Sequence, residues 1–511
     1  MSKNIGTILL LFFCVIVFFF TIRGIAGNPK AEELNTPKWR NDGPFEQTGR
    51  FSLLYSVVED HSFQFSLPLA RFAAPDLAIT NNGAYVSLFA PGVSFLAIPG
   101  YVIGKYFGIA QVGTFAVISL FAISNIFLIR AIVIKLGISS IAGTIGGLVF
   151  AFATPAFPYG VDLYQHHIST FLILFSIFSL LYFSDFVALF VVWFCFVTSI
   201  TVDYPNFLMM LPIGIYALTR VFVTKKTGKT LRIEINFLKF LTFLAVIFPL
   251  AFFLWFNNMS YGSPFRLSGA LERVTKIDTK GNPLNVKIDK DKTESVQDSF
   301  TKQISVLSWF NPRLMINGFY IHFFSPDRGI MRYTPVMFFG FVGGAIFIVK
   351  KRRFAILFAY IVSLNILIYS MWGDPWGGWA FGSRYLIPSY AILSIFIAYL
   401  ISILSKKNLF LVVFFAVVSY SVAVNTLGAL TSSLNPPKIE ADVLSREAGY
   451  EFKYTYGRNI DFLNNYGSKS YIYNIYMGNF VSPWNYYIDI TFLIIAVFAF
   501  LLSYNRIRQE L

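Results

Sequence analysis

The sequence predicts an all-α polytopic membrane protein with about twelve transmembrane helices. Hydrophobic residues make up 56% of the 511 residues, and charged residues make up only 13%. Apolar runs of about 20 residues, the length that crosses a hydrocarbon core of ~30 Å, recur along the whole chain. Because lipid satisfies no backbone hydrogen bonds, these runs are expected to be helices, and a soluble globular chain is excluded.

The basic residues predict the orientation of the chain. The formal net charge is +15, but Lys and Arg lie in short clusters between the apolar runs. Clusters of this kind are typical of cytoplasmic loops, so we predict no nucleic-acid partner. The predicted inner segments are Arg220–Arg232, Lys350–Arg353, Lys406–Lys407 and Arg506–Arg508.

The chain is predicted to alternate between membrane and polar regions. Tyr85–Phe107 is apolar, but Pro91 and Pro99, each followed by Gly, interrupt it, so we interpret it as a juxtamembrane or re-entrant segment. The expected regions are a first transmembrane helix (1–22), a first outer loop with that segment (23–110), a transmembrane bundle (111–256), an outer loop with a polar insertion (257–327), a second bundle (328–428) with an outer loop at 372–384, an outer Tyr-rich lobe (429–487), and a last transmembrane helix with a cytoplasmic tail (488–511). The large polar intervals all fall on the outer side. We therefore expect an integral protein of a prokaryotic cytoplasmic membrane whose active site faces outward.

Several motifs follow one another in a recognisable order. An acidic first loop with a nearby arginine (Asp42 to Arg50) is followed by APG at Ala90–Gly92, TPAFPYG at Thr154–Gly160, NNMSYGSPF at Asn257–Phe265, FFSPDRGIMRYTPV at Phe323–Val336 and WGGWAFGSRYLIP at Trp376–Pro388. Up to about Ser405, this order resembles the GT-C superfamily of polyprenyl-phosphate-sugar-dependent glycosyltransferases, the group of protein O-mannosyltransferases and lipid A aminoarabinose transferases. The first loop departs from that pattern, since it reads NDGP where these transferases have an Asp-Glu pair.

The resemblance implies a GT-C-like fold and a glycosyltransferase of the cell envelope. Such an enzyme transfers a sugar, with inversion, from a polyprenyl-phosphate donor to an extracytoplasmic acceptor, which is a protein, a lipid or a surface glycan. The chemistry needs a base for the acceptor hydroxyl, cations for the departing phosphate and a groove for the prenyl chain.

Asp42 is the candidate catalytic base, with Glu46 in reserve. A carboxylate within hydrogen-bond reach of the acceptor hydroxyl can take its proton. The alternative role for Asp42 is structural, because Asp just ahead of a first-turn proline, here Pro44, is a common helix N-cap. The sequence leaves both interpretations open.

Four arginines are candidates for binding the donor phosphate: Arg50, Arg328, Arg332 and Arg384. The planar guanidinium can hold two phosphate oxygens at once. Arg384 is expected at the outer end of a span, where a lipid phosphate would lie. Arg328 and Arg332 would share a helix face if PDRGIMR is helical. The alternative for an arginine at the end of a span is snorkelling to the interface.

The remaining candidates are expected to line the pocket: Asp162, His166, His167, Trp376 and Trp379. The tryptophan rings could stack on a sugar or flank the prenyl chain. On a helix, Asp162 and His166 would lie on one side and could hold a divalent ion. No third ligand is evident nearby in the sequence, so a metal is not favoured and no cofactor is predicted. Asp203, near Pro205, is interpreted as a turn cap.

Two other function classes stay open. A polytopic transporter or lipid-glycan flippase would carry ionisable residues in mid-span and an internal repeat, and neither is clear in the sequence. A polysaccharide ligase or polymerase shares the predicted topology. The sequence contains no Walker-type phosphate loop, so it gives no support to ATP-driven transport. Cys14 and Cys195 both lie in apolar runs, so no disulfide framework is expected.

Overall fold

The computed structural model describes residues 2–40, 48–227, 230–278, 280–284 and 310–510. Within these residues, six helices are long and apolar enough to cross a membrane by length and composition. They are α6 (Ala110–Lys135), α10 (Asp185–Val202), the continuous run of α12 (Phe237–Phe240) through α13 (Ile247–Tyr261), the run from Arg384 through α18 (Ile387–Leu404), α19 (Asn408–Leu430) and α22 (Pro483–Glu510). Six shorter apolar helices accompany them: α1 (Ser2–Thr21), α7 (Ser140–Phe152), α9 (His166–Tyr182), α11 (Asn206–Val221), α16 (Met337–Val349) and α17 (Ala355–Ser370). The predicted class, an all-α polytopic membrane protein, is confirmed.

Helix α18 forms the centre of the bundle. In its apolar 18-residue window, 89% of the residues are buried, and the helix packs against α6, α7, α9, α16 and α17. A helix that is hydrophobic on all sides is expected inside a bundle. By contrast, only 17% of the window in α12–α13 is buried, so this segment lies at the edge.

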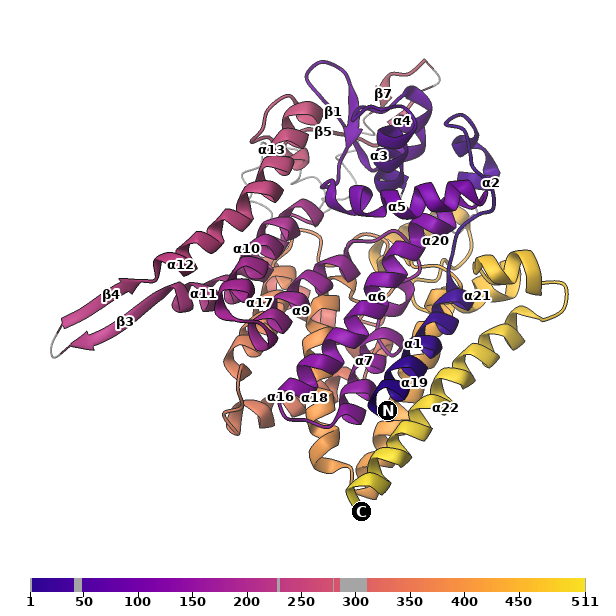
Figure 1. Ribbon diagram of the computed structural model, residues 1–511. Helices are drawn as coiled ribbons and strands as arrows, with labels where there is room; N and C mark the ends of the chain where they lie inside the picture. Colours follow the sequence, from indigo (N-terminus) through magenta and orange to yellow (C-terminus); the bar gives the residue numbers. More distant parts are fainter. Residues whose placement is uncertain (1, 41–47, 228–229, 279, 285–309, 511) are drawn as a thin grey trace.

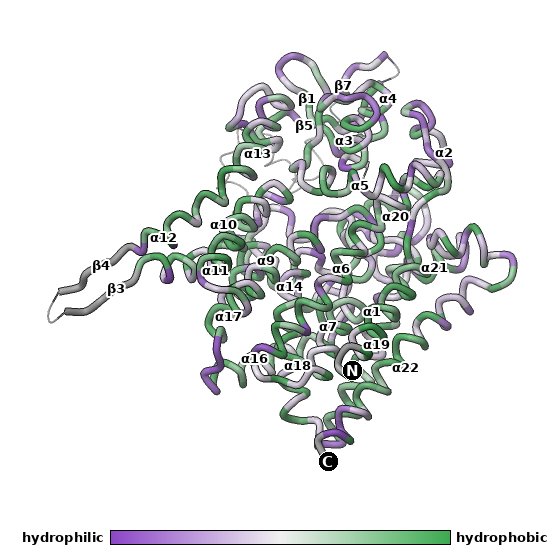
Figure 2. The backbone as a smooth tube through the Cα atoms, in the orientation of Figure 1, coloured by the Kyte–Doolittle hydropathy of each residue, from purple (hydrophilic) through white to green (hydrophobic). Residues whose placement is uncertain are grey.

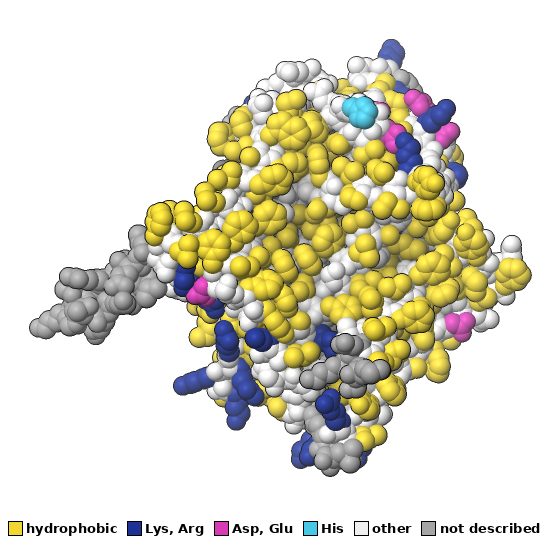
Figure 3. Space-filling model, in the orientation of Figure 1, with side chains coloured by type: hydrophobic (Ala, Val, Ile, Leu, Met, Phe, Trp, Pro, Cys, Tyr) yellow, Lys and Arg dark blue, Asp and Glu magenta, His cyan; other side chains and the backbone are white. Residues whose placement is uncertain are grey.

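The surface is divided by polarity along the long axis of Figure 1. Hydrophobic residues cover most of the helical body, and hydrophilic segments gather towards its upper end (Figure 2). On the face shown in Figure 3, Lys and Arg concentrate at the lower end, around the turn between α16 and α17, and acidic residues lie mainly near the upper end. This turn is Lys350–Arg353, one of the predicted inner segments.

A polar cap lies above the helix ends in Figure 1, and we define it as residues 28–40, 48–89, 262–278 and 280–284. It contains α2 (Pro37–Arg40), α3 (Thr48–Val58), α4 (Leu67–Ala73) and an antiparallel sheet with the strand order β2–β1–β5. In β1 (Leu77–Ile79), Leu77 pairs with Ser87 of β2 (Tyr85–Ser87) and with Val274 of β5 (Glu272–Val274). The sheet therefore joins the predicted first outer loop to the loop that follows α13.

Helix α5 (Gly92–Tyr106) corresponds to the apolar segment that we expected to be juxtamembrane or re-entrant. It has 15 residues with Pro99 inside, which is too short to cross a ~30 Å hydrocarbon core. It crosses the beginning of α6 closely, since a Cβ at Gly113 would collide with the backbone of Gly100 and would lie 2.7 Å from the Cα of Gly104. Only glycine allows the two backbones to approach in this way.

Two short hairpins depart from the sequence prediction. β3 (Phe222–Thr227) pairs with β4 (Thr230–Ile235) across the first basic cluster, and the hairpin projects away from the body (Figure 1). The run TLRIEI alternates and is rich in β-branched residues, which favours a strand. β6 (Lys276–Ile277) pairs with β7 (Pro283–Leu284) in the cap. The remaining helices are short: α8 (Ala156–Tyr159), α14 (Met315–Phe323), α15 (Ile330–Tyr333), α20 (Lys438–Ala448) and α21 (Gly457–Tyr466).

Candidate active site

Where the cap lies against the helix bundle, two arginines lie within electrostatic range of two carboxyl groups from separate elements. Arg50 is in α3, and Asp76 directly precedes β1. Asp203 directly follows α10, and Arg384 begins the helical turn that leads into α18. Arg50 and Arg384 are close enough to influence the proton affinities of both carboxyl groups. We call these residues the four-charge cluster.

Close backbone packing brings the elements of the cluster together. A Cβ at Gly49 would lie 2.6 Å from the carbonyl oxygen of Asp76 and 2.7 Å from its Cβ, so α3 touches Asp76 directly. A Cβ at Gly92 would lie 2.7 Å from the carbonyl oxygen of Thr201. The beginning of α5 is thereby held against the end of α10, next to Asp203. Glycine at these positions is what allows cap and bundle to share one site.

Burial sets the proton affinities of the cluster. It raises the pKa of Asp76 and the pKa of Asp203, because each carboxylate loses water that would stabilise its charge. At Asp76, Arg273 and Arg50 oppose this rise in pKa. At Asp203, Arg50 and Arg384 oppose it. Burial lowers the pKa of Arg50 to about 10, against the effect of both carboxylates, so Arg50 is protonated at neutral pH.

The guanidinium of Arg384 lies among aromatic rings. Its central carbon is 5.5 Å from the ring centre of Tyr164, 5.7 Å from that of Tyr385 and 6.0 Å from that of Tyr159. Its Nη2 donates a hydrogen bond to the carbonyl oxygen of Gly377 at 2.7 Å, and its Nε has no hydrogen-bond partner among the described residues. The aromatic faces attract the cation and exclude water, which leaves donor capacity for an anionic ligand.

His166 and Gln165 add neutral polar groups to the site. His166 is buried at the beginning of α9, with its ring stacked 6.0 Å from that of Tyr164 and within electrostatic range of Arg384. Its Nε2 has no hydrogen-bond partner among the described residues. Gln165 donates from Nε2 to Oδ2 of Asp203 at 3.2 Å, and within the described part of the chain its Oε1 has no partner. These atoms are available to a polar, uncharged ligand.

Arg328 and Arg332 lie apart from each other, contrary to the expectation of a shared helix face. The helix α15 begins only at Ile330, so Arg328 stands in the turn before it. Arg328 is fully buried, and its Nη1 donates to the carbonyl oxygens of Trp376 and, at 3.0 Å, Gly378. Arg332 is exposed and lies at a separate pocket. Arg328 therefore holds the loop that precedes Arg384 and does not face the four-charge cluster with it.

Asp162 and His167 make internal contacts in the bundle. We expected Asp162 and His166 to share one side of a helix, but α9 begins only at His166, so Asp162 lies outside it. Its Oδ2 lies 3.4 Å from Nη1 of Arg23, and both side chains are fully buried. Nε2 of His167 lies 2.7 Å from the carbonyl oxygen of Ala156. No group of three His, Cys, Asp or Glu residues among the described residues could hold a metal ion.

The two tryptophans have different neighbours. The carbonyl oxygen of Trp376 accepts from Arg328, so this residue is part of the loop before Arg384. Nε1 of Trp379 donates to Oε2 of Glu440 in α20 at 2.6 Å, and Arg458 lies 5.3 Å from its ring centre. Trp379 thus joins this loop to the predicted Tyr-rich lobe.

The sequence prediction and the structure overlap in part of the site. Asp42 and Glu46 lie outside the described residues, between α2 and α3. Arg50, Arg384 and His166 were expected at the site and do come together. Asp76 was missed, and Asp203 was interpreted only as a turn cap. The available sequence signal at Asp203 was its place at the end of a predicted apolar span, and no predicted element marked Asp76.

Comparisons with known proteins give two structural relatives. No protein-family model matches the chain, and no curated protein matches it significantly. The crystal structure of ArnT from Cupriavidus metallidurans in the apo state is similar over 99% of this chain and 78% of that chain, with 12% sequence identity and a TM-score of 0.46. The same protein bound to undecaprenyl phosphate is similar over 98% of this chain and 77% of that chain, with the same identity and TM-score.

Proposed function

We propose that the protein is a membrane glycosyltransferase of the GT-C type that transfers a sugar from a polyprenyl-phosphate donor to an acceptor outside the cytoplasm. The observation that supports this most is the four-charge cluster at the cap end of an apolar helix bundle. A lipid-phosphate donor brings an anionic headgroup to this level while its chain stays in the hydrocarbon core. Arginines that are shielded from water are the side chains best suited to bind such a phosphate.

The proposed reaction is a single displacement at the anomeric carbon. The acceptor hydroxyl oxygen forms a bond to this carbon while the bond from the carbon to the phosphate oxygen breaks. The phosphate leaves with the bonding electron pair, and Arg50 and Arg384 stabilise its increasing negative charge. The hydroxyl proton passes to a carboxylate. Attack from the face opposite the leaving phosphate inverts the configuration of the sugar.

Asp42 is our proposed base, with Glu46 in reserve. Both residues directly precede α3 in the chain, and α3 carries Arg50. Asp76 and Asp203 are assigned a different role, because each lies within electrostatic range of both Arg50 and Arg384. They balance the charge of Arg50 and Arg384 until the phosphate arrives. Oε1 of Gln165 is proposed to accept a hydrogen bond from a sugar hydroxyl, and Nε2 of His166 to form a hydrogen bond with another.

The test follows the release of free polyprenyl phosphate by the purified protein from polyprenyl-phosphate sugar donors. We expect the wild type to turn over. Asp42→Asn and Arg384→Ala should lose about 100-fold or more, the scale of removing a general base or an electrostatic stabiliser, while still binding lipid. Arg446→Ala, on the exposed side of α20, is the matched control and should keep full activity. Absence of donor consumption by the wild type, together with movement of a lipid or solute across vesicles, would establish a transporter instead.

A further inference from the structure

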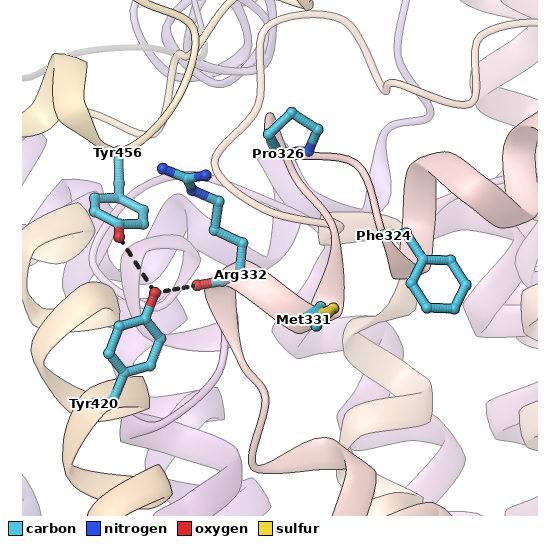
Figure 4. A pocket seen from close by; sticks show the side chains of 6 residues that line it. All are labelled: Phe324, Pro326, Met331, Arg332, Tyr420 and Tyr456. Carbon is cyan, nitrogen blue, oxygen red and sulfur yellow. Dashed lines mark hydrogen bonds between the residues drawn. The ribbon is translucent and has the colours of Figure 1, made fainter.

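A second candidate site has a lining that shares no residue with the four-charge cluster. It is a pocket of about 430 Å³ lined by Phe324, Pro326, Met331, Arg332, Tyr420 and Tyr456 (Figure 4). The lining comes from α15, α19, the turn before α15 and the segment that leads into α21. Arg332 is the one side chain among these six that is charged at neutral pH. A ligand of this pocket therefore meets a positive charge.

The guanidinium of Arg332 is held in place but keeps its hydrogen-bonding capacity. Its central carbon lies 5.2 Å from the ring centre of Tyr456, and in Figure 4 the group extends between Tyr456 and Pro326. The hydroxyl of Tyr420 donates to the backbone carbonyl oxygen of Arg332 at 3.0 Å and lies 3.3 Å from the hydroxyl of Tyr456. The side chain of Arg332 makes no hydrogen bond to any residue in the described part of the chain. The stacked, preorganised guanidinium is ready to bind an anion.

The rim of the pocket is hydrocarbon-like. Met331 is 61% exposed and Phe324 is 50% exposed, so both side chains can contact lipid acyl chains. A row of ring contacts leads from the pocket to α16: Phe324 to Phe323 at 6.2 Å, Phe323 to Phe341 at 5.6 Å, and Phe341 to Phe338 at 6.5 Å. Such a row provides an apolar path beside a charged headgroup.

The position of Arg332 along the membrane normal is compatible with contact to a lipid headgroup. Helix α16 has 13 residues, so it rises roughly 20 Å from the basic turn that begins at Lys350. Arg332 lies beyond the other end of α16, a short turn further on. Arg332 and the basic turn therefore lie at opposite ends of α16. A phosphate group in the opposite leaflet would lie at this level.

We infer that this pocket binds an anionic phospholipid of the bilayer, with the lipid phosphate on Arg332 and an acyl chain along Phe324 and Phe338. The inference does not depend on the proposed transferase activity. The charge of the pocket favours a phosphate that carries net negative charge, and the apolar rim favours a lipid over a free anion. Asp327, a buried acid in the turn before α15, lies 3.5 Å from Nε of Arg328 and so is already paired.

The test counts lipids bound to the full-length protein by native mass spectrometry during titration with phosphatidylglycerol and, separately, with phosphatidylcholine. We expect Arg332→Ala to weaken phosphatidylglycerol binding about tenfold, the scale of a lost charge-assisted hydrogen bond, and to leave phosphatidylcholine binding unchanged. Arg332→Lys should recover part of the loss. The variant should fold, because Tyr420 bonds the backbone carbonyl of residue 332 and not its side chain.

Two controls separate this site from other sources of anionic-lipid binding. Arg446→Ala removes an exposed arginine of α20 that does not line the pocket, and it should bind phosphatidylglycerol like the wild type. Equal phosphatidylglycerol binding by wild type and Arg332→Ala would overturn the inference. Competition by a polyprenyl phosphate for the same Arg332-dependent site, at lower concentration than phosphatidylglycerol, would also overturn it, since the pocket would then belong to a substrate lipid.

Discussion

Arg328 serves the candidate site without facing its ligand. Its guanidinium bonds the carbonyl oxygens of Trp376 and Gly378, and between these two residues the carbonyl oxygen of Gly377 accepts from Arg384. Arg328 thus holds the loop through Trp376 and Gly378, and Arg384 bonds the same loop at Gly377. The orientation of Arg384 is therefore expected to depend on the buried Arg328.

Replacing Arg328 tests this dependence. Arg328→Met should destabilise the protein by about 3–5 kcal/mol, because Asp327 is left buried without its cation. The double variant Asp327→Asn with Arg328→Met should recover most of that loss, since no uncompensated charge remains. Chemical unfolding in detergent measures both. If Arg328→Met were as stable as the wild type, the hydrogen bonds from Arg328 to the loop would not be needed for stability.

Asp203 should make stability depend on pH. Burial raises the pKa of Asp203 in the folded protein above its ordinary value of ~4. At pH values between the ordinary and the raised pKa, the native state holds a proton that the unfolded chain has lost. The contribution of Asp203 to stability therefore falls as pH rises through this window. Asp203→Asn cannot titrate and should lose less stability than the wild type over the same window. Thermal unfolding at a series of pH values measures the difference, with Asp461→Asn, an exposed carboxylate of α21, as the control.

At the scale of elements, the crossing of α5 and α6 determines where the cap meets the bundle. The two backbones touch at Gly100, Gly104 and Gly113, and the beginning of α5 then contacts the end of α10 at Thr201. The proline and glycine residues in this segment predicted that it is not an ordinary span, and α5 has only 15 residues. They could not predict its partner, because close approach between helices has no periodic signature in the sequence.

A larger side chain where α5 crosses α6 should displace α5. Gly113→Ala places a methyl group against the backbone of Gly100 and Gly104, so we expect a loss of about 1–3 kcal/mol in stability and a loss of activity through the shifted Thr201 contact. Gly6→Ala in α1, where a Cβ would meet nothing within 4 Å, is the matched control and should be neutral or slightly stabilising. Equal unfolding midpoints for the two variants would argue against a tight crossing.

The sheet of the cap shows what local sequence reasoning misses. β1 and β5 have three residues each, too few for an alternating pattern to be recognised, and their pairing joins distant parts of the chain. Asp76 directly precedes β1, so its place in the four-charge cluster depends on this non-local pairing. Arg384 could be found from sequence because it stands at the end of a long apolar run. Arg328 was misplaced because a proline and a glycine in SPDRG replace the expected helix by a turn.

At the scale of the whole molecule, the distribution of charge predicts the orientation in the membrane. Arg353 lies in the basic turn at the lower end of Figure 1, and Arg446 lies in the outer lobe of our prediction. Short loops that are rich in Lys and Arg stay on the cytoplasmic side of the membrane. The fold class could be predicted because hydrophobic runs and basic clusters are properties of composition, which need no knowledge of contacts.

Cysteine labelling in intact cells tests the orientation. The native Cys14 and Cys195 are buried, so the wild type gives a low background. A membrane-impermeant maleimide should label Arg446→Cys in intact cells and should label Arg353→Cys only after the membrane is permeabilised. Labelling of Arg353→Cys in intact cells would invert the topology and place the four-charge cluster at the cytoplasmic side.

The pairing of β1 with β5 also affects how the chain folds while it is being synthesised. β1 ends at Ile79, and its partner strand is not made until Val274 has been added. At about 5–20 residues per second, roughly ten to forty seconds separate the two events. Before the interval ends, the ribosome has added Arg50, Asp76 and Asp203. Asp76 still lacks β5, one of the strands that fix its position, throughout the interval. The nascent chain can therefore carry most of the charged groups of the site through membrane insertion before they acquire their final arrangement.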